Sequence, residues 1–255
     1  MAIDQWVEDT TRQKVRELVP SGALNADTHL ILVNAVYFKG MWELQFSRAA
    51  TRDEPFHLEG DGKVQAPLMQ QHEEVRYLQT GGYQAVDLLY RGGDLSMLVL
   101  LPNRKDGLRD LEKALSMRML QDCEAQMANH EVELFLPRFK ITWGTVNLRD
   151  QLTALGMPLA FEGGQANFSG INGYEPPHND SLSISAVFHK ATVETNEEGT
   201  EAAAATAVPM ERTGRSSPQR VPVFRADHPF LFAIRDRKSG AILFLGRMAD
   251  PTRDW

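Results

Sequence analysis

The spacing of hydrophobic positions changes early in the chain. In "IDQWVEDTTRQKVRELV" the apolar residues recur at close to helical intervals, at Ile3, Trp6, Val7, Val15 and Leu18. This pattern predicts an amphipathic helix over residues 2–19. After the turn "PSGALNADT", residues 29–38 ("HLILVNAVYF") form a nearly continuous apolar run, which predicts a strand covered on both faces. Asn34 interrupts that run, and a buried amide needs a hydrogen-bond partner.

Strand and helix patterns then follow without regular alternation. Strand-like segments are "EVRYLQ", "QAVDLLY", "LSMLVLLP", "EVELFLPRFKI" and "SISAVFHKATVE", and helical ones are "LRDLEKAL", "MRMLQDCEAQMA" and "NLRDQLTALGM". The last two apolar runs, "PFLFAIRD" and "AILFLGRM", are joined by "RKSG" and predict a hairpin. Clustered strands favour an α+β fold over a doubly wound sheet. With no repeat or linker in view, we expect one domain over residues 1–255.

Composition narrows the possible partners. The chain has 255 residues, of which 42% are hydrophobic and 24% charged, which is ordinary for a globular protein. Its formal net charge is -7, and Lys and Arg are not clustered, so we expect no nucleic-acid partner. No apolar stretch reaches the roughly 18 residues of a membrane span, and the start lacks a signal-peptide pattern. We expect no membrane partner, and the sequence leaves the compartment undetermined.

The usual signatures of catalysis are missing from the sequence. It contains no G-x-S-x-G, G-x-G-x-x-G, G-x-x-x-x-G-K-[ST] or H-E-x-x-H pattern, and its seven histidines are scattered singly. Cys123 is the one cysteine, which excludes an intrachain disulfide, and it lies in a helical pattern that does not favour a nucleophile. We therefore expect no enzyme activity, no cofactor and no metal site.

Residues 195–219 fit neither a helix nor a core strand. Ala202–Ala205 favour a helix by propensity alone, but Pro209, Gly214 and Pro218 follow and predict an exposed loop that a protease could cut. Small uncharged side chains would also fit between two strands of a sheet. The segment therefore predicts a loop that can become a strand.

These segments together resemble the serpin family. "EEGTEAAAATA" looks like the hinge of the serpin reactive-centre loop, and residues 224–234, "FRADHPFLFAI", match the family signature that follows it. Further segments are similar in family order: "THLILVNAVYFKGMWELQF", "FLPRFKI", "LGM" with "AFEGGQANFSGI", "SAVFHKATVETNEEGT" and "LFLGRMADP". The resemblance extends from residue 3 to residue 251.

The resemblance implies a fold and a mechanism. The fold would be the α+β serpin fold with a large mixed sheet, two smaller sheets and surrounding helices, and the reactive-centre loop would span about residues 197–223. The chain would be a suicide-type inhibitor of a trypsin-like serine protease, trapping the acyl-enzyme by inserting its cleaved loop into the large sheet. A monomer is expected, and the family's frequent secretion favours an extracellular location.

The resemblance also assigns roles to individual residues. Asn34 and His189 fall where relatives place a hydrogen-bonded pair beneath the strands that part, and Trp42 resembles the tryptophan near the point where insertion begins. The loop hinge would consist of Glu197, Glu198, Gly199, Thr200, Glu201, Ala202, Ala203, Ala204 and Ala205.

The position of the bait bond depends on how the loop is counted. Counting from the hinge gives Thr213, whereas counting back from "FRADHPF" gives Arg215–Ser216. We favour Arg215–Ser216 and take Arg212–Thr213 as second choice, since an arginine suits an acidic specificity pocket. Pro209 departs from the family pattern, because within an inserted strand it removes a ladder hydrogen bond.

Residues 2–19 resemble the helix over the front of the large sheet, so the family's N-terminal third would be absent and the domain truncated. Three interpretations stay open: a protease inhibitor, a non-inhibitory serpin that binds or carries a ligand, and an inactive truncated fragment.

Overall fold

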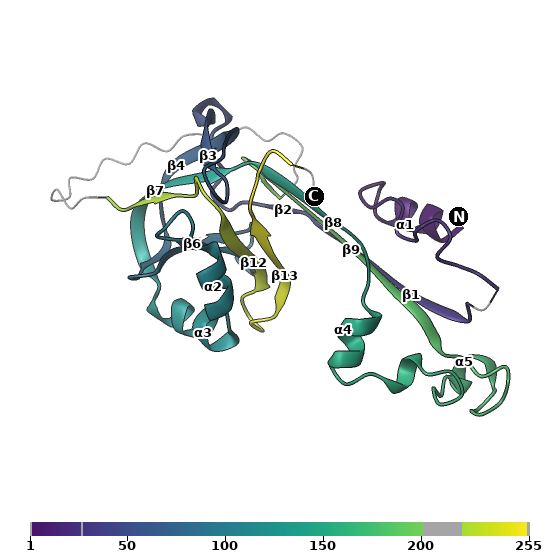
Figure 1. Cartoon of the computed structure of the whole chain (residues 1–255). Helices are drawn as coiled ribbons and strands as arrows, with labels where there is room; N and C mark the ends of the chain where they lie inside the picture. Colours follow the sequence, from purple (N-terminus) through teal and green to yellow (C-terminus); the bar gives the residue numbers. More distant parts are fainter. Residues whose placement is uncertain (1, 27, 201–220, 254–255) are drawn as a thin grey trace. The chain divides into compact units, whose positions relative to one another are not determined.

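A computed structural model describes residues 2–26, 28–200 and 221–253 of the chain (Figure 1). The described residues group into two compact units. The first unit holds the chain up to Phe38 together with Ile141–Val193, and the second holds Lys39–Lys140 together with Glu194–Asp254. The expectation of a single domain over residues 1–255 stays a prediction.

The first unit is built on a parallel pair of strands. Strand β1 (Leu30–Phe38) runs parallel to β9 (Ile184–Asn196), with Asn34 opposite His189, and β8 (Phe139–Asn147) also pairs with β9. The helical segments of this unit are α1 (Ala2–Thr10), α4 (Arg149–Ala154), η2 (Leu159–Phe161) and α5 (Ser169–Asn172).

Helix α1 is shorter than the predicted helix over residues 2–19, since it ends at Thr10. The Thr11 hydroxyl donates to the Val7 carbonyl at 2.8 Å and accepts from the Val15 amide at 3.1 Å. Such side-chain hydrogen bonds offer the backbone an alternative to the helix. Three residues beyond have positive φ, which a right-handed helix excludes: Arg12, Gln13 and Glu17. The prediction was wrong for residues 11–19, although Val15 and Leu18 are fully buried as their spacing required.

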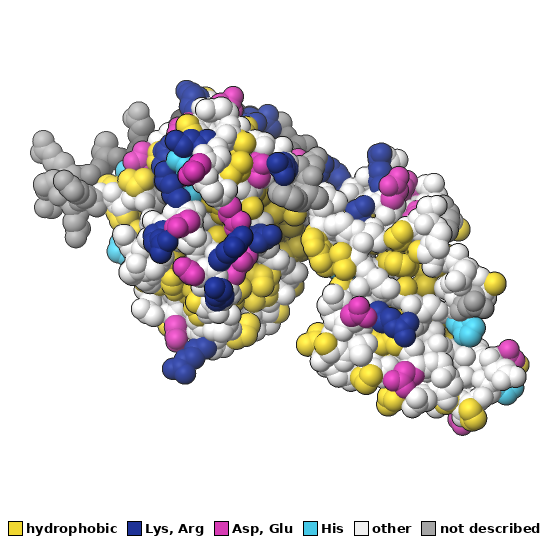
Figure 2. All heavy atoms as spheres, viewed as in Figure 1, with side chains coloured by type: hydrophobic (Ala, Val, Ile, Leu, Met, Phe, Trp, Pro, Cys, Tyr) yellow, Lys and Arg dark blue, Asp and Glu magenta, His cyan; other side chains and the backbone are white. Residues whose placement is uncertain are grey.

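Strand β1 lies where it was predicted, but it is not covered on both faces. Its residues alternate in exposure, and Leu32 is 42% exposed. Asn34 lies on the same exposed face, so its amide is open to water and the expected requirement for a buried partner was wrong. An apolar run thus identified the strand but not its surroundings. Hydrophobic side chains reach the surface of this unit in Figure 2 (yellow).

The second unit contains an eight-stranded sheet in the order β11-β7-β4-β5-β6-β12-β13, with β3 paired to β4. Its strands are β3 (Arg52–His57), β4 (Lys63–Gln79), β5 (Tyr83–Leu89), β6 (Leu95–Pro102), β7 (Ala128–Pro137), β11 (Val223–Arg225), β12 (Phe230–Asp236) and β13 (Ile242–Met248). The long strand β4 pairs with β3, β5 and β7 and so joins these strands into one continuous sheet. The predicted hairpin is confirmed as β12–β13.

Helices α2 (Leu108–Ala114) and α3 (Met117–Gln126) cover the part of this sheet around β6 (Figure 1). Leu98 and Leu100 of β6 share a buried cluster with Leu108 of α2 and Cys123 of α3. Ser116 caps α3 by accepting a hydrogen bond from the Met119 amide. Burial raises the pKa of the Cys123 thiol, which keeps the thiol protonated and weakens it as a nucleophile.

Candidate functional site

The described part of the predicted hinge already lies within a sheet. After β9 the chain turns back, and Gly199–Thr200 form the short strand β10, which we call the hinge strand. It pairs antiparallel with the end of β9 on one side and with β2 (Gly40–Met41) on the other. The hinge strand therefore occupies a position between two strands.

Gly199 fits this position because it has no side chain. Its φ is +147°, a backbone conformation that other residues rarely adopt. A Cβ atom at Gly199 would lie 2.5 Å from the Met41 Cα and would also overlap the Gly40 carbonyl oxygen. The close approach of two backbones thus requires glycine here.

Thr200 is fully buried and held by an aromatic pair. Its hydroxyl lies 2.8 Å from the Tyr90 hydroxyl, and the Tyr90 ring stacks on Trp42 with centroids 4.6 Å apart and an interplanar angle of 12°. Burial raises the pKa of Tyr90, so this hydroxyl keeps its proton. A small polar side chain at position 200 satisfies this buried hydroxyl where a larger one would not fit.

Trp42 fastens the turn that leads into the hinge strand. Its indole Nε1 donates to the Asn196 carbonyl at 2.9 Å, and its backbone amide donates to the Glu198 carbonyl at 2.9 Å. The side chain is only 1% exposed. The prediction placed Trp42 near the beginning of insertion, and the structure brings it into direct contact with the hinge segment.

Glu197 is clamped by residues from two other segments. The Arg138 Nε donates to both carboxylate oxygens, at 2.7 and 2.8 Å, and the Thr51 hydroxyl donates to Oε1. The Glu197 side chain is only 3% exposed. Burial raises the pKa of this carboxyl, but the hydrogen bonds from Arg138 and Thr51 outweigh it, and the pKa lies below its usual value. The clamp thus stabilises the ionised form of Glu197.

Glu198 is held in a second ion pair. Its carboxylate pairs with Arg48, which lies in η1 (Arg48–Ala50), and its carbonyl accepts from the Gln45 side chain at 3.3 Å. The other carboxylate oxygen, Oε2, is buried and has no partner within the described ranges. Both glutamates at the start of the hinge are therefore fixed through arginines.

The predicted pair Asn34 and His189 lies in the first unit, on neighbouring strands and in register. No hydrogen bond joins the two side chains among the residues that the structure describes. His189 Nδ1 is buried without a partner in that same set, and its ring lies 5.6 Å from the Trp143 ring. The structure brings the two residues together, whereas their shared hydrogen bond stays a prediction.

The remaining predicted site residues lie outside the described residues. They are Glu201, Ala202, Ala203, Ala204, Ala205, Arg212, Thr213, Arg215 and Ser216.

The sequence reasoning missed five residues whose side chains hold the hinge: Gln45, Arg48, Thr51, Tyr90 and Arg138. Arg138 had a usable signal, because it directly follows the apolar run "FLP" in "FLPRFKI". Tyr90 and Thr51 had no such signal, since their partners lie 110 and 146 positions away in the chain.

Two further expectations concern absences. In residues 2–26, 28–200 and 221–253, no cluster of His, Cys, Asp and Glu could hold a metal ion. None of the described helices has the length and apolar character of a membrane span.

Comparison with known proteins identifies the family. The family model described as "Serpin (serine protease inhibitor)" matches residues 1–251. The chain is 41% identical to human Serpin B4 over 98% of its own length, and 38% identical to a protein named serine protease inhibitor from Cyanea capillata, also over 98%. The chain therefore belongs to the serpin family.

Solved structures agree with this assignment. The chain is similar to Serpin48 from the insect Tenebrio molitor, with a TM-score of 0.82 and 30% identity over 98% of this chain. It is also similar to uncleaved ovalbumin, with a TM-score of 0.83 and 31% identity over 98% of this chain. The α+β serpin fold is confirmed. The chain spans 63% of Serpin B4, 64% of the Cyanea protein, 64% of Serpin48 and 62% of ovalbumin.

Proposed function

We propose that this chain is a suicide-type inhibitor of a trypsin-like serine protease and acts as a trap rather than as an enzyme. The observation that carries the proposal is the hinge strand, whose Gly199 and Thr200 already lie between two strands. A loop that enters a sheet residue by residue needs its first residues in that position. A relative from Cyanea capillata named serine protease inhibitor supports the same function.

The reaction would begin on the protease. Its serine oxygen attacks the carbonyl carbon of the bait residue, the peptide bond breaks, and the new amino terminus leaves with the proton. The loop residues before the cut would then continue the hinge strand into the sheet before water can hydrolyse the ester. About 15 inserted residues at roughly 3.3 Å each would carry the attached protease about 50 Å.

The bait bond remains Arg215–Ser216 in this proposal, with Arg212–Thr213 as second choice. A guanidinium on the bait residue fits the acidic specificity pocket of a trypsin-like protease. Mixing the purified chain with trypsin tests both the trapping of the protease and the position of the bait bond. SDS gels reveal a covalent complex, and intact masses reveal which bond is cut. We expect a complex together with a released fragment that begins at Ser216.

A substitution at the hinge separates an inhibitor from a substrate. Thr200→Arg places a charged side chain where the hydroxyl is fully buried beside Tyr90, so insertion should fail and trypsin should cleave the loop without forming a complex. Thr200→Ser keeps the hydroxyl and serves as the matched control. Complex formation by Thr200→Arg at the wild-type level would contradict the proposal.

A second candidate is a serpin chain that proteases cleave without being trapped. The observation that favours it is the exposed face of β1, where Leu32 is 42% exposed. Clean cleavage of the wild-type chain with no covalent complex would support this candidate.

A further inference from the structure

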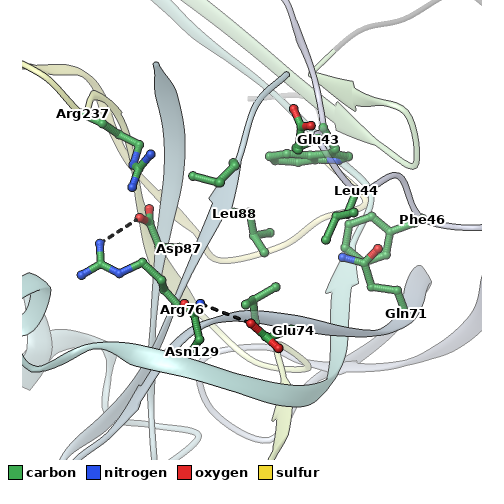
Figure 3. Close-up of a pocket in the computed structure, with 13 residues that line it drawn as sticks. Glu43, Leu44, Phe46, Gln71, Glu74, Arg76, Asp87, Leu88, Asn129 and Arg237 are labelled. Carbon is green, nitrogen blue, oxygen red and sulfur yellow. Dashed lines mark hydrogen bonds and ion pairs between the residues drawn. The ribbon is translucent and has the colours of Figure 1, made fainter. Parts of the chain in front are cut away.

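A cavity of about 290 Å³ lies within the second unit (Figure 3). Its apolar lining includes Trp42, Leu44, Phe46, Val75 and Leu88. The volume is near the lower end of the range for small-molecule sites, roughly 300–1,000 Å³. The cavity therefore suits a small organic molecule with an apolar body.

The charges around the cavity fall into two sets. In the first, Arg76 and Arg235 alternate with Asp87 and Glu124: Arg76 lies 3.6 Å from Asp87 and 3.8 Å from Glu124, and Arg235 lies 2.9 and 2.8 Å from the same carboxylates. Two positive and two negative groups balance in this set. It leaves no net charge for a ligand.

The second set consists of Glu43, Glu74 and Arg237, which also line the cavity. Glu43 accepts a hydrogen bond from the Gly92 amide and Glu74 from the Asn129 side chain, and within the described part of the chain neither carboxylate has an ion pair. In the view of Figure 3 the two carboxylates lie on opposite sides of the leucines. With Arg237 counted, the set is net negative by one charge, which favours a cation over an anion.

One residue of the cavity wall, Trp42, also contacts the segment that leads into the hinge strand. Trp42 lines the cavity, stacks on Tyr90, and donates hydrogen bonds to the carbonyls of Asn196 and Glu198. A molecule that packs against the indole makes contacts that depend on where this side chain lies. It therefore binds one arrangement of the hinge better than another, which is the condition for coupling two sites.

We propose that the cavity binds a small monocationic amphiphile, an amine on an aromatic or aliphatic body, and that the bound molecule stabilises the hinge strand in its present position. Binding and hinge protection are independent of the function proposed above. The consequence for inhibition rests on that function: a bound amine should slow loop insertion and raise the share of loop that is cleaved without trapping.

Three probes of one shape test the class of ligand. They are 1-naphthylmethylamine, the neutral 1-naphthalenemethanol and the anionic 1-naphthoate, titrated into the purified wild-type chain by ligand-observed NMR. We expect the amine to bind best, by about two- to fivefold over the alcohol, as one partly exposed ion pair would give. Equal binding of all three probes, or no binding of any, would overturn the proposal.

Charge variants locate the site. Glu74→Gln should weaken the amine about threefold and leave the alcohol unchanged, because only the amine uses the carboxylate. Glu131→Gln is the matched control, since Glu131 is an exposed glutamate opposite Glu74 on β7 that does not line the cavity. If the two variants weakened amine binding equally, the amine would bind elsewhere on the chain, and the proposal that it binds in this cavity would be refuted.

Hydrogen exchange of the peptide that covers residues 196–200 tests the coupling. We expect the amine to slow exchange there in the wild-type chain and not in Glu74→Gln at the same concentration. Unchanged exchange at saturation would overturn the coupling. A chain that binds the amine and protects the hinge but forms no trypsin complex would refute the proposed function alone.

Discussion

Strands β1 and β6 carry similar apolar sequences, "LILVNAVYF" and "LSMLVLLP", yet they have different surroundings. In the second unit, β6 is buried along almost its whole length, with sheet neighbours on both sides and helices over one face. In the first unit, Leu32 and Asn34 of β1 are exposed and only Phe38 is buried. Sequence pattern therefore sets the strand, whereas the rest of the structure decides how much stability its side chains contribute.

The largest expected effect comes from shortening one leucine side chain in each strand to alanine. Leu98→Ala in β6 removes a side chain that is 1% exposed and should cost about 3 kcal/mol of unfolding free energy. Leu32→Ala in β1 starts from 42% exposure and should cost less than about 1 kcal/mol. Urea denaturation followed by circular dichroism measures both. Equal losses would mean that β1 is as well covered as β6.

Two glycines give the next test. Gly199→Ala places a Cβ atom against the backbone of β2 at a positive φ, so it should cost about 2 kcal/mol and expose the hinge amides. Gly144→Ala in β8 is the control from the first unit, because a Cβ there meets no atom within 4 Å. Urea midpoints and hydrogen exchange at residues 196–200 measure the effect. A tolerated Gly199→Ala would show that the two backbones can separate without loss.

The Glu197 clamp predicts a dependence on pH. Its folded-state pKa lies below the usual carboxyl value, so the stabilisation is present above about pH 4.5 and is lost as the pH falls through the lowered folded pKa. Arg138→Gln should lower the free energy of unfolding by about 2 kcal/mol at pH 7, because it leaves the buried Glu197 carboxylate without its arginine. The loss is not larger because the Arg138 guanidinium is itself partly exposed. The difference in unfolding free energy between the wild type and Arg138→Gln should shrink at acid pH.

Lys190→Gln provides the matching measurement in the first unit. The Lys190 amine donates to the Arg16 carbonyl at an exposed position, so its loss should be small and nearly independent of pH between 3 and 7. Denaturation curves for both variants across that range are the measurement. If the difference in unfolding free energy between the wild type and Arg138→Gln did not shrink toward pH 3, the proposed stabilisation by ionised Glu197 would be contradicted.

The smallest expected effect comes from a single hydroxyl. Tyr90→Phe leaves the fully buried Thr200 hydroxyl without this partner and should cost about 1 kcal/mol. Thr192→Val in the first unit removes a hydroxyl whose contact with Thr142 is 3.5 Å long, so it should cost nothing measurable. Thermal melts of the two variants decide between these outcomes, and a larger loss for Thr192→Val would reverse the expected order.

Much of the fold followed from the sequence because it depends on local periodicity. Strand β6 and the β12–β13 hairpin lie at or within one residue of their predicted bounds. The end of α1 could not be predicted, because it depends on hydrogen bonds from the Thr11 hydroxyl to the Val7 carbonyl and from the Val15 amide to that hydroxyl. The exposure of β1 could not be predicted either, since an apolar run does not say what packs on it.

The candidate site was predictable only where a residue resembled a family position. That resemblance identified Trp42 and the hinge residues from Glu197 onward. The pairing of these residues with their partners could not be predicted from the sequence, because Arg138 and Glu197 are 59 positions apart and Tyr90 and Thr200 are 110 positions apart. Only folding brings these partners within hydrogen-bonding distance.

The stacked pair of Trp42 and Tyr90 gives the hinge a built-in optical reporter. Of the tryptophans in the described residues, Trp42 is 1% exposed, whereas Trp6 and Trp143 are 61% and 46% exposed. Its fluorescence should therefore be shifted to the blue and shielded from aqueous quenchers. Any movement of the hinge strand disturbs the stack and the hydrogen bond from the indole to Asn196. Stopped-flow emission could thus time loop movement in the unlabelled chain.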